Sequence, residues 1–427
     1  MRIRRMMLIV LVCVVSFAFS ARGAYSREPA RERGRSRQSL EKRDTLTDGW
    51  FGAGETLGQY GFEVGLGVTN VYQYNLHDGT EPGNGAYSGS YDLEIEGDLD
   101  RAFGLRGGTI FMLAEGSRAE STGLDDRSVG SLFGINDDFG GDRSLDITEL
   151  WYQQDFLDGD LRVRAGKLDL SAGYEFNGVP VAFDGSLYAN DEAGQFLNGS
   201  LVNNPSIPFP DNGLGVSVFI SPLDRWYFAA GAADAKADAR TTGFNTVFDG
   251  NPRFFGIAET GIVPGIRSAK GRLPAAYRMG IWNTRIPREH LQENRTRRDD
   301  VGGYISADQM LWRENKQDLQ GLGAFTRLGV ASDTVNEVEF FGSLGLSYRG
   351  LVPGRGEDVL GLGYAHGDLS THGGFSASSE QVIEVYYQAQ VAPWLRISPD
   401  LQLVSDPGGD RSSGDVLAAG VRVQVDF

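Results

Sequence analysis

The sequence predicts an all-β fold, a transmembrane antiparallel up-and-down β-barrel of about sixteen strands with long outward loops and short periplasmic turns. Three observations predict it. Alternation of apolar and polar residues with period two recurs from about residue 61 to the last residue. The alternating segments are bounded by Gly, Pro, Asp and Asn, the residues typical of turns. No apolar run after the N-terminal segment approaches the ~20 residues that a membrane helix requires.

The N-terminal segment, residues 1–20, has the layout of a secretory signal. Three arginines within the first five residues precede a continuous apolar run, and small residues offer cleavage positions near 20–24. Residues 21–47 form a polar, basic tail that cannot bury enough apolar surface to fold alone. The predicted organisation is therefore a signal peptide (1–20), a tail (21–47) and a barrel domain (48–427).

Charge and cysteine content exclude several classes of protein. Residues 1–43 hold eleven Lys or Arg and three Asp or Glu, so the remainder is more acidic than the net charge of −17 of the whole chain. An acidic surface repels phosphate backbones, so we expect no nucleic-acid partner. The only cysteine, Cys13, lies in the signal, so we expect neither a disulfide framework nor a thiolate metal site after export.

The predicted strands are even in number, as in single-chain bacterial barrels. They are expected at 61–74, 88–99, 107–115, 145–156, 160–170, 213–220, 225–233, 253–262, 275–285, 301–312, 320–330, 338–349, 357–366, 381–391, 394–404 and 415–427.

Connections between these strands alternate in length, as the two rims of a barrel demand. Tight turns are expected at Asp158-Gly159, at 221–224 and at Ala392-Pro393. The long, Gly-, Asn-, Asp- and Ser-rich connections are 171–212, 234–252, 286–300, 367–380 and 405–414. Segment 171–212 is too long for an ordinary hairpin loop, so folding inward to narrow the lumen is a hypothesis for it.

The C-terminal strand shows the alternation most clearly, with Val421, Val423, Val425 and Phe427 separated by Arg422, Gln424 and Asp426. A soluble sandwich and a membrane barrel both produce this pattern, so the alternation leaves the two open. The terminal Phe427 resembles the signal by which outer-membrane barrels are recognised for assembly. It implies the barrel assembly machinery and outer-membrane lipid as partners.

Several motifs resemble those of the carbohydrate-selective porins of Gram-negative bacteria. They are Glu149-Leu150-Trp151-Tyr152-Gln153-Gln154 with Phe156-Leu157-Asp158-Gly159, the following Arg164-Ala165-Gly166-Lys167-Leu168-Asp169, the Gly-rich stretch after Trp50, the segment from Gly350 to Gly361, and the segments Pro393-Trp394-Leu395 and Pro407-Gly408-Gly409. The resemblance covers roughly residues 48–427. The basic tail departs from the family pattern.

The resemblance implies an outer-membrane channel for facilitated diffusion of monosaccharides and small carbohydrates, with no catalytic activity and no cofactor. A general, non-selective diffusion porin for small solutes and ions is the alternative. A barrel enzyme and a secreted all-β binding protein are the rivals from other classes. The oligomeric state stays open between a monomer and a homotrimer.

Residues on one face of the predicted hairpin around Asp158-Gly159 are the principal pore-lining candidates. Glu149, Trp151, Gln153 and Asp155 share a face, and Arg162 and Arg164 share a face on the returning strand. A two-residue turn would place Arg162 opposite Asp155 and Arg164 opposite Gln153. The same parity adds the candidates Arg278, Trp282, Glu384 and Arg396, and then Asp92, Glu94, Glu96, Tyr386 and Asp400. Such planar polar groups and aromatic rings suit recognition of a sugar, although a passive wall of paired charges explains them as well.

The histidines give little support to an enzyme or a metal site. His77, His290, His366 and His372 are scattered over predicted loops and strand ends, with neither metal-ligand spacing nor a Gly-x-Ser-x-Gly context.

Overall fold

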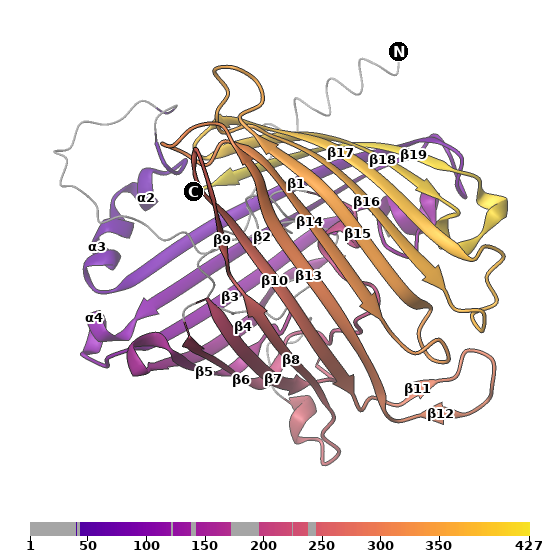
Figure 1. Cartoon of the computed structure of the whole chain (residues 1–427), viewed down its shortest axis with the longest axis horizontal. Coiled ribbons are helices and arrows are strands. Elements are labelled where there is room, and N and C mark those ends of the chain that lie inside the picture. The colour runs from indigo at the N-terminus through magenta and orange to yellow at the C-terminus, as the bar shows by residue number, and fades with distance from the viewer. Residues whose placement is uncertain are drawn as a thin grey trace.

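The computed structural model describes residues 40, 43–120, 123–137, 142–171, 196–223, 225–237 and 245–427. The predicted signal peptide and most of the basic tail lie outside these residues. Within the described ranges the chain forms a barrel of sixteen long antiparallel strands. Figure 1 shows the arrangement of these strands around the barrel. The predicted fold class is confirmed.

The strands of the barrel agree with the predicted segments to within a few residues at each end. They are β1 (Phe62–His77), β2 (Gly85–Asp98), β3 (Gly108–Ala119), β4 (Arg143–Phe156), β5 (Leu161–Leu168), β6 (Gly213–Leu223), β7 (Trp226–Asp234), β8 (Phe254–Ile262), β10 (Gly271–Thr284), β13 (Asp300–Arg313), β14 (Gly321–Val330), β15 (Val338–Arg349), β16 (Val359–Leu369), β17 (Ser379–Ala392), β18 (Leu395–Ser405) and β19 (Val416–Asp426).

Each long strand pairs with its neighbours in the chain, and the last strand closes the barrel on the first. In the closing pair, Val68 lies opposite Val425 and Asn70 lies opposite Val423. Closure pairs both β1 and β19 along their two edges, so these strands can satisfy their backbone groups within the protein. In lipid each unpaired backbone group would cost several kcal/mol, about the same as burying a polar group in an apolar medium without a hydrogen bond.

The two faces of the wall differ in the sense expected for a membrane barrel. Apolar side chains such as Met279, Ile281 and Leu344 are more than half exposed on the outer face. Charged side chains such as Arg327 and Arg422 are almost fully buried on the inner face. A soluble sandwich would show the opposite distribution, so the structure decides between the two folds that the alternation left open.

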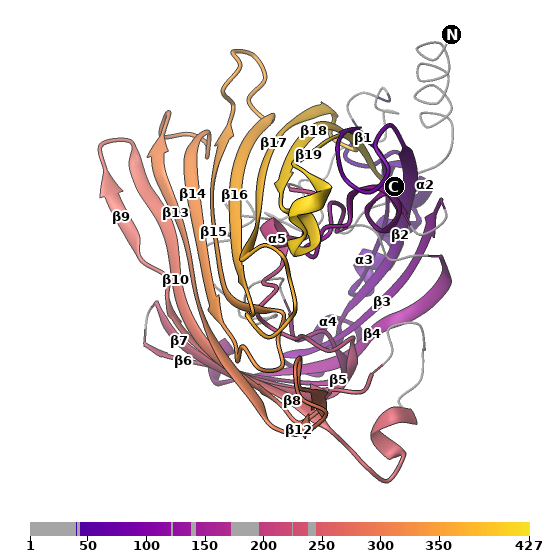
Figure 2. The same ribbon diagram turned by 90° about the vertical axis from the view of Figure 1, so that its right-hand side faces the viewer.

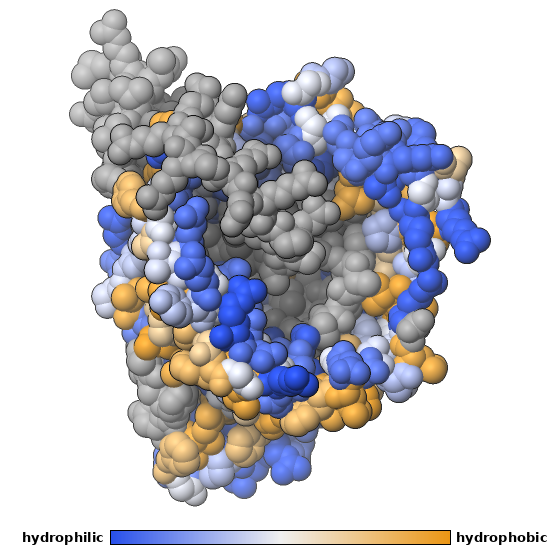
Figure 3. All heavy atoms as spheres, turned by 90° about the vertical axis from the view of Figure 1, so that its left-hand side faces the viewer, coloured by the Kyte–Doolittle hydropathy of each residue, from blue (hydrophilic) through white to orange (hydrophobic). Residues whose placement is uncertain are grey.

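Short helices lie at one end of the barrel, which we call the terminal rim because β1 begins and β19 ends there. They are α2 (Asp48–Phe51), α3 (Ala53–Gln59) and α4 (Leu99–Phe103), at the left of Figure 1. Figure 3 looks onto this rim, where hydrophilic residues border the central hollow and hydrophobic residues gather on the outer wall. No helix in the described part of the chain is long and apolar enough to cross a membrane.

The opposite end, the loop rim, carries the longer connections. They are 78–84, 120–142, 169–212, 235–253, 285–299, 331–337, 370–378 and 406–415. Figure 2 looks into the barrel from this rim and shows α5 (Gly199–Val202) inside the ring of strands. The alternation of short and long connections agrees with the prediction.

Three details differ from the sequence prediction. Strand β9 (Gly265–Ser268) pairs with the start of β10 and extends that hairpin at the terminal rim. Strands β11 (Arg288–Glu289) and β12 (Thr296–Arg297) form a small hairpin within the 285–299 loop. The turn between β4 and β5 spans residues 157–160 rather than two residues, with Leu157 and Asp158 at positive φ.

Candidate functional site

The inner face of the β4–β5 hairpin brings together the six principal candidates. Asp155 lies opposite Arg162 and Gln153 lies opposite Arg164, the register that the sequence predicts, because the four-residue turn preserves the pairing of a two-residue turn. Arg162 donates from Nε to Asp155 Oδ1 at 2.9 Å, and Arg164 donates from Nη2 to Gln153 Oε1 at 3.1 Å. The side chains of Asp155 and Arg162 keep about a quarter of their surface exposed, so they face open lumen.

The Arg164 guanidinium is held by an aromatic stack. Its Cζ lies 3.8 Å from the centroid of the Trp151 ring, and Phe111 of β3 stacks on Trp151 at 4.9 Å between centroids. Trp151 Nε1 donates to Glu149 Oε2 at 2.9 Å, which fixes the indole. Trp151 is therefore only 8% exposed. Its ring does not face the lumen openly but positions the Arg164 guanidinium, which lies over it.

Gly166 makes this stack possible. It lies opposite Trp151 at φ 145°, and a Cβ at this position would approach the Trp151 Cα to 2.6 Å. Any other residue would displace the indole or the strand, because real Cβ atoms do not approach backbone so closely.

A second charged group lies further around the wall, on β10, β13 and β14. Asp308 accepts from Arg278 Nη1 at 2.6 Å and from Arg327 Nη2 at 2.8 Å, and the three side chains are nearly fully buried. Both guanidinium groups thus donate to the same carboxylate. The predicted pore-lining residue Arg278 is thus ion-paired with Asp308 of the adjacent strand.

A third group places a carboxylate between two phenols. Glu259 of β8 accepts from Tyr227 Oη at 2.6 Å and from Tyr304 Oη at 2.7 Å, and it is only 1% exposed. Trp282 lies beside this group, stacked on Phe255 at 6.3 Å and 1% exposed. The aromatic side chains of β7, β8, β10 and β13 therefore form a packed inner wall.

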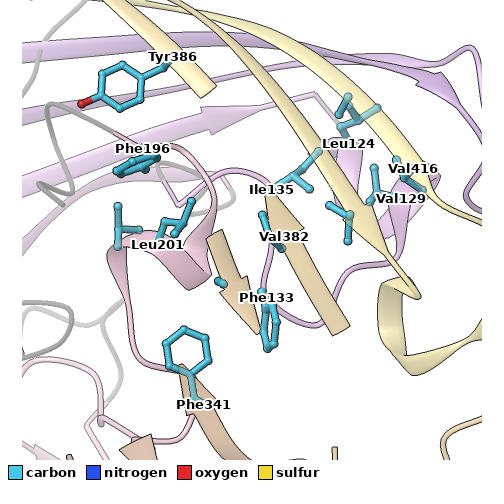
Figure 4. Packing of buried hydrophobic residues seen from close by; sticks show 14 of the residues in the cluster. Leu124, Val129, Phe133, Ile135, Phe196, Leu201, Phe341, Val382, Tyr386 and Val416 are labelled. Carbon is cyan, nitrogen blue, oxygen red and sulfur yellow. The ribbon is translucent and has the colours of Figure 1, made fainter. Parts of the chain in front are cut away.

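Two segments of chain fold into the barrel from the loop rim and pack against its wall. Residues 123–137, between β3 and β4, contribute Leu124, Val129, Phe133 and Ile135, as Figure 4 shows. The described part of the 169–212 connection contributes Phe196 and α5. The hypothesis that this connection folds inward is supported for residues 196–209, whereas residues 172–195 lie outside the described residues.

Both inward segments are anchored on carboxylates of β17. Glu380 accepts from Ser131 Oγ at 2.5 Å, from the Leu132 amide at 2.9 Å and from the Gly408 amide at 2.6 Å. Glu384 accepts from the amides of Leu197 at 2.7 Å and Asn198 at 2.8 Å, and is 0% exposed. The predicted pore-lining residue Glu384 thus holds a segment that narrows the lumen, and the segment covers it.

Asp125 lies in the first inward segment, outside the strands that cross the membrane. Its Oδ1 accepts from the Ser131 amide at 3.0 Å. Burial raises the pKa of this carboxyl to about 7, and repulsion from Glu380 and Asp126 adds to the rise. Its charge therefore changes near neutral pH, next to the anchor at Glu380.

The remaining predicted residues lie apart from the β4–β5 cluster. Arg396 of β18 donates to Asp426 at 3.4 Å, near the terminal rim. Phe427 donates its backbone N–H to Leu66 at 3.0 Å, next to the closing seam. The sequence prediction missed Phe111, Glu259 and Arg327, although period-two parity within the expected strands points to the inner face for each. It also missed Glu380, which precedes the expected strand 381–391 and lies in β17 because that strand begins at Ser379.

The described residues hold no side-chain cluster suited to a metal ion. None of their His, Cys, Asp and Glu side chains form a group of three or more able to hold a metal ion. His366 contacts Asp368 at 3.0 Å, and His372 contacts Gln292 at 2.9 Å, both at strand ends or in loops.

A closed sixteen-strand barrel with a polar inner face, narrowed by segments that fold in from one rim, defines a porin. Over residues 83–427 the chain matches the model of the carbohydrate-selective porin, OprB family. The chain belongs to this family, and it is an outer-membrane carbohydrate channel.

Individual relatives are distant in sequence but cover nearly the whole chain. Porin B of Pseudomonas aeruginosa is 23% identical over 416 residues, which covers 88% of this chain and 90% of Porin B. The high-pH structure of Pseudomonas putida OprB superposes with a TM-score of 0.77 at 19% identity, covering 91% of this chain and all of that chain. The low-pH structure of the same protein gives a TM-score of 0.55 at 18% identity, with 91% and 99% covered. At these identities the structures support the fold.

Proposed function

We propose that the chain conducts monosaccharides and small oligosaccharides across the outer membrane by facilitated diffusion, and that the β4–β5 cluster selects them. The observation that carries the proposal is the position of the Arg164 guanidinium. The Trp151 ring holds it at 3.8 Å, beside Arg162 and Asp155, on a wall open to the lumen.

Such a cluster matches the surface of a sugar. Guanidinium groups donate several hydrogen bonds in a fixed plane, and carboxylates accept from neighbouring hydroxyls. A sugar that crosses the narrow region exchanges part of its hydration shell for these contacts. Glu96, exposed on β2, adds an acceptor to the inner wall, and its carboxylate interacts electrostatically with Arg164.

The proposal extends to the way in which the chain reaches the membrane. Residues 1–20 act as an export signal, and the terminal Phe427 is recognised during barrel assembly. The chain itself supplies the pathway, with no cofactor and no catalytic step.

Single-channel recording in planar bilayers tests the proposal. Glucose and other sugars are titrated against an inert polymer of similar size, with the protein refolded in detergent. We expect saturable reduction of the ionic current by sugar and not by polymer. Conductance that sugar leaves unchanged would favour a general diffusion porin, and a protein without conductance would contradict both channel functions.

A further inference from the structure

A cavity of about 550 Å³ opens at the loop rim, away from the β4–β5 cluster. Its apolar lining residues include Leu132 of the first inward segment, Pro205 and Pro208 of the second, and Pro287 and Val335 of two rim loops. Its described lining includes no residue of β4 or β5. Anything bound there touches both segments that narrow the lumen.

The polar edge of this cavity is built on a buried frame. Asp300 is 2% exposed and Asn336 is 6% exposed, and Asn336 Nδ2 donates to Asp300 Oδ2 at 2.9 Å. Arg288 donates from Nη1 to Asp300 Oδ2 at 3.3 Å and also to Asn336 Oδ1. The guanidinium is thus fixed in direction by two buried partners.

Some polar groups at this edge of the cavity remain able to form hydrogen bonds with a ligand. Arg288 Nε and Nη2 make no hydrogen bond to a described residue, and both belong to a side chain that lines the cavity. Glu289 and Glu337 also line it, are exposed, and make no ion pair within the described chain. The cavity is therefore lined by hydrogen-bond donors and acceptors together with apolar side chains.

This combination selects for one class of ligand. Carboxylates accept from adjacent hydroxyl groups, a guanidinium donates to ring and hydroxyl oxygens, and proline and aliphatic carbons pack against the C–H face of a pyranose. The charges of Glu289 and Glu337 are not balanced, because the charge of Arg288 is neutralised by Asp300. The resulting negative charge disfavours anionic ligands. The volume suits a small ligand, being within the range of about 300–1,000 Å³ of ordinary small-molecule sites.

We propose that this cavity is an external capture site for a pyranose sugar, occupied before the sugar reaches the β4–β5 cluster. The inference rests on the proposed function, because the cavity would be the first binding site for a sugar that then passes through the channel. Occupancy raises the local sugar concentration at the mouth of the constriction and thereby raises the entry rate from the loop rim.

Protection of a single engineered thiol tests the capture site directly. Cys13 is the only native cysteine, so a Cys13→Ser chain carrying Pro287→Cys reports on the cavity alone. A membrane-impermeant thiol reagent is added to refolded protein with increasing glucose, and the modification rate is measured. Pro82→Cys, on the exposed 78–84 loop of the same rim, is the matched control.

We expect glucose to slow modification of Pro287→Cys in a saturable manner and to leave Pro82→Cys unchanged. Adding Glu289→Gln and Glu337→Gln should raise the half-protecting concentration about tenfold, because two charged acceptors are lost. Glu293→Gln, in the same loop but outside the cavity, should leave it unchanged. Unchanged single-channel conductance in salt verifies that each variant forms the barrel.

The outcomes separate this inference from the proposed function. If glucose reduces the channel current but does not protect Pro287→Cys, the capture site is wrong and the carbohydrate channel stands. If glucose does neither, both proposals fail. Equal protection by the inert polymer would also overturn the capture site, since it would reflect exclusion of the reagent by bulk solute.

Discussion

Arg164 acquires its role from the residues around it. A lone lumen arginine would sample many rotamers, whereas here Trp151 lies under the guanidinium and Gln153 accepts from it. Trp151 is in turn held by Glu149 and Phe111. The conformational entropy of the Arg164 side chain is therefore already lost before a sugar binds, so that binding does not have to order this side chain.

Replacing Arg164 should weaken sugar block without preventing barrel formation. In Arg164→Gln we expect the half-blocking glucose concentration to rise about tenfold, because hydrogen bonds from a charged donor are worth roughly 1.5–3 kcal/mol. The measurement is current reduction in planar bilayers. Arg106→Gln, at an exposed position on the turn after β2, is the matched control. Identical block in both variants would remove Arg164 from the selective site.

Asp125 should make the first inward segment sensitive to pH. Its pKa is raised from 3.8 to about 7, so protonation favours the folded arrangement. That contribution is complete below pH 3.8 and is lost as the pH rises through about 7. We therefore expect current fluctuations of the open channel to increase as the pH rises through 7.

The control for this pH response is the adjacent, exposed Asp126. Asp125→Asn should give fluctuations that do not change between pH 6 and pH 8, about one unit on each side of the midpoint, whereas Asp126→Asn should retain the response. A response that persists in Asp125→Asn would assign the titration to another group.

At the scale of elements, the inner faces of β16 and β17 together hold the two inward segments in place. The inner face of β16 carries Gly361, Gly363 and Gly367, and the inner face of β17 carries Glu380 and Glu384. Gly363 and Gly367 give the segments room, whereas Gly361 gives room to the Tyr386 ring. The carboxylates accept backbone N–H groups of the segments. A Cβ on Gly363 would lie 2.7 Å from Leu201 and 2.8 Å from Phe196.

A bulky residue on this face should displace α5. We expect Gly363→Val to raise the single-channel conductance, because overpacking of a filled site costs typically about 1–3 kcal/mol and the segment yields before the barrel does. Gly342→Val, on the outer face of β15, meets no atom closer than 3.3 Å and should conduct like the parent. Unchanged conductance in Gly363→Val would show that the inward segment does not limit the pathway.

At the scale of the whole molecule, the fold depends on the closing seam between β1 and β19. Val423 lies opposite Asn70 on one side and Ile397 on the other, so its strand is paired along both edges. Closure is the step that satisfies the backbone of the first and last strands at once.

A proline in the last strand should prevent stable closure. Val423→Pro removes an N–H from the ladder and so leaves a backbone group unpaired, at a cost of several kcal/mol in lipid, whereas Val423→Ala keeps the N–H. We expect Val423→Pro to lose the faster electrophoretic migration of unheated barrel and Val423→Ala to keep it. A proline variant that migrates like the parent would show that the seam tolerates an unpaired group.

Local information in the sequence determined the number of strands, the face of each residue and the register of the β4–β5 hairpin. Period two assigns faces without reference to the rest of the chain, and a short turn fixes which residues pair across it. Thus Arg162 and Asp155 could be paired from the sequence, and the predicted pair is present at 2.9 Å.

Only the tertiary structure decided which inner-face residues remain accessible. Parity gives Glu384 and Arg164 the same inward assignment, but Glu384 is covered by Leu197 and Asn198, nearly 190 residues away in the chain. Contacts of this kind depend on how loops fold back across the lumen. They leave no periodic signal in the sequence, because they join single positions on segments that meet only after the barrel has closed.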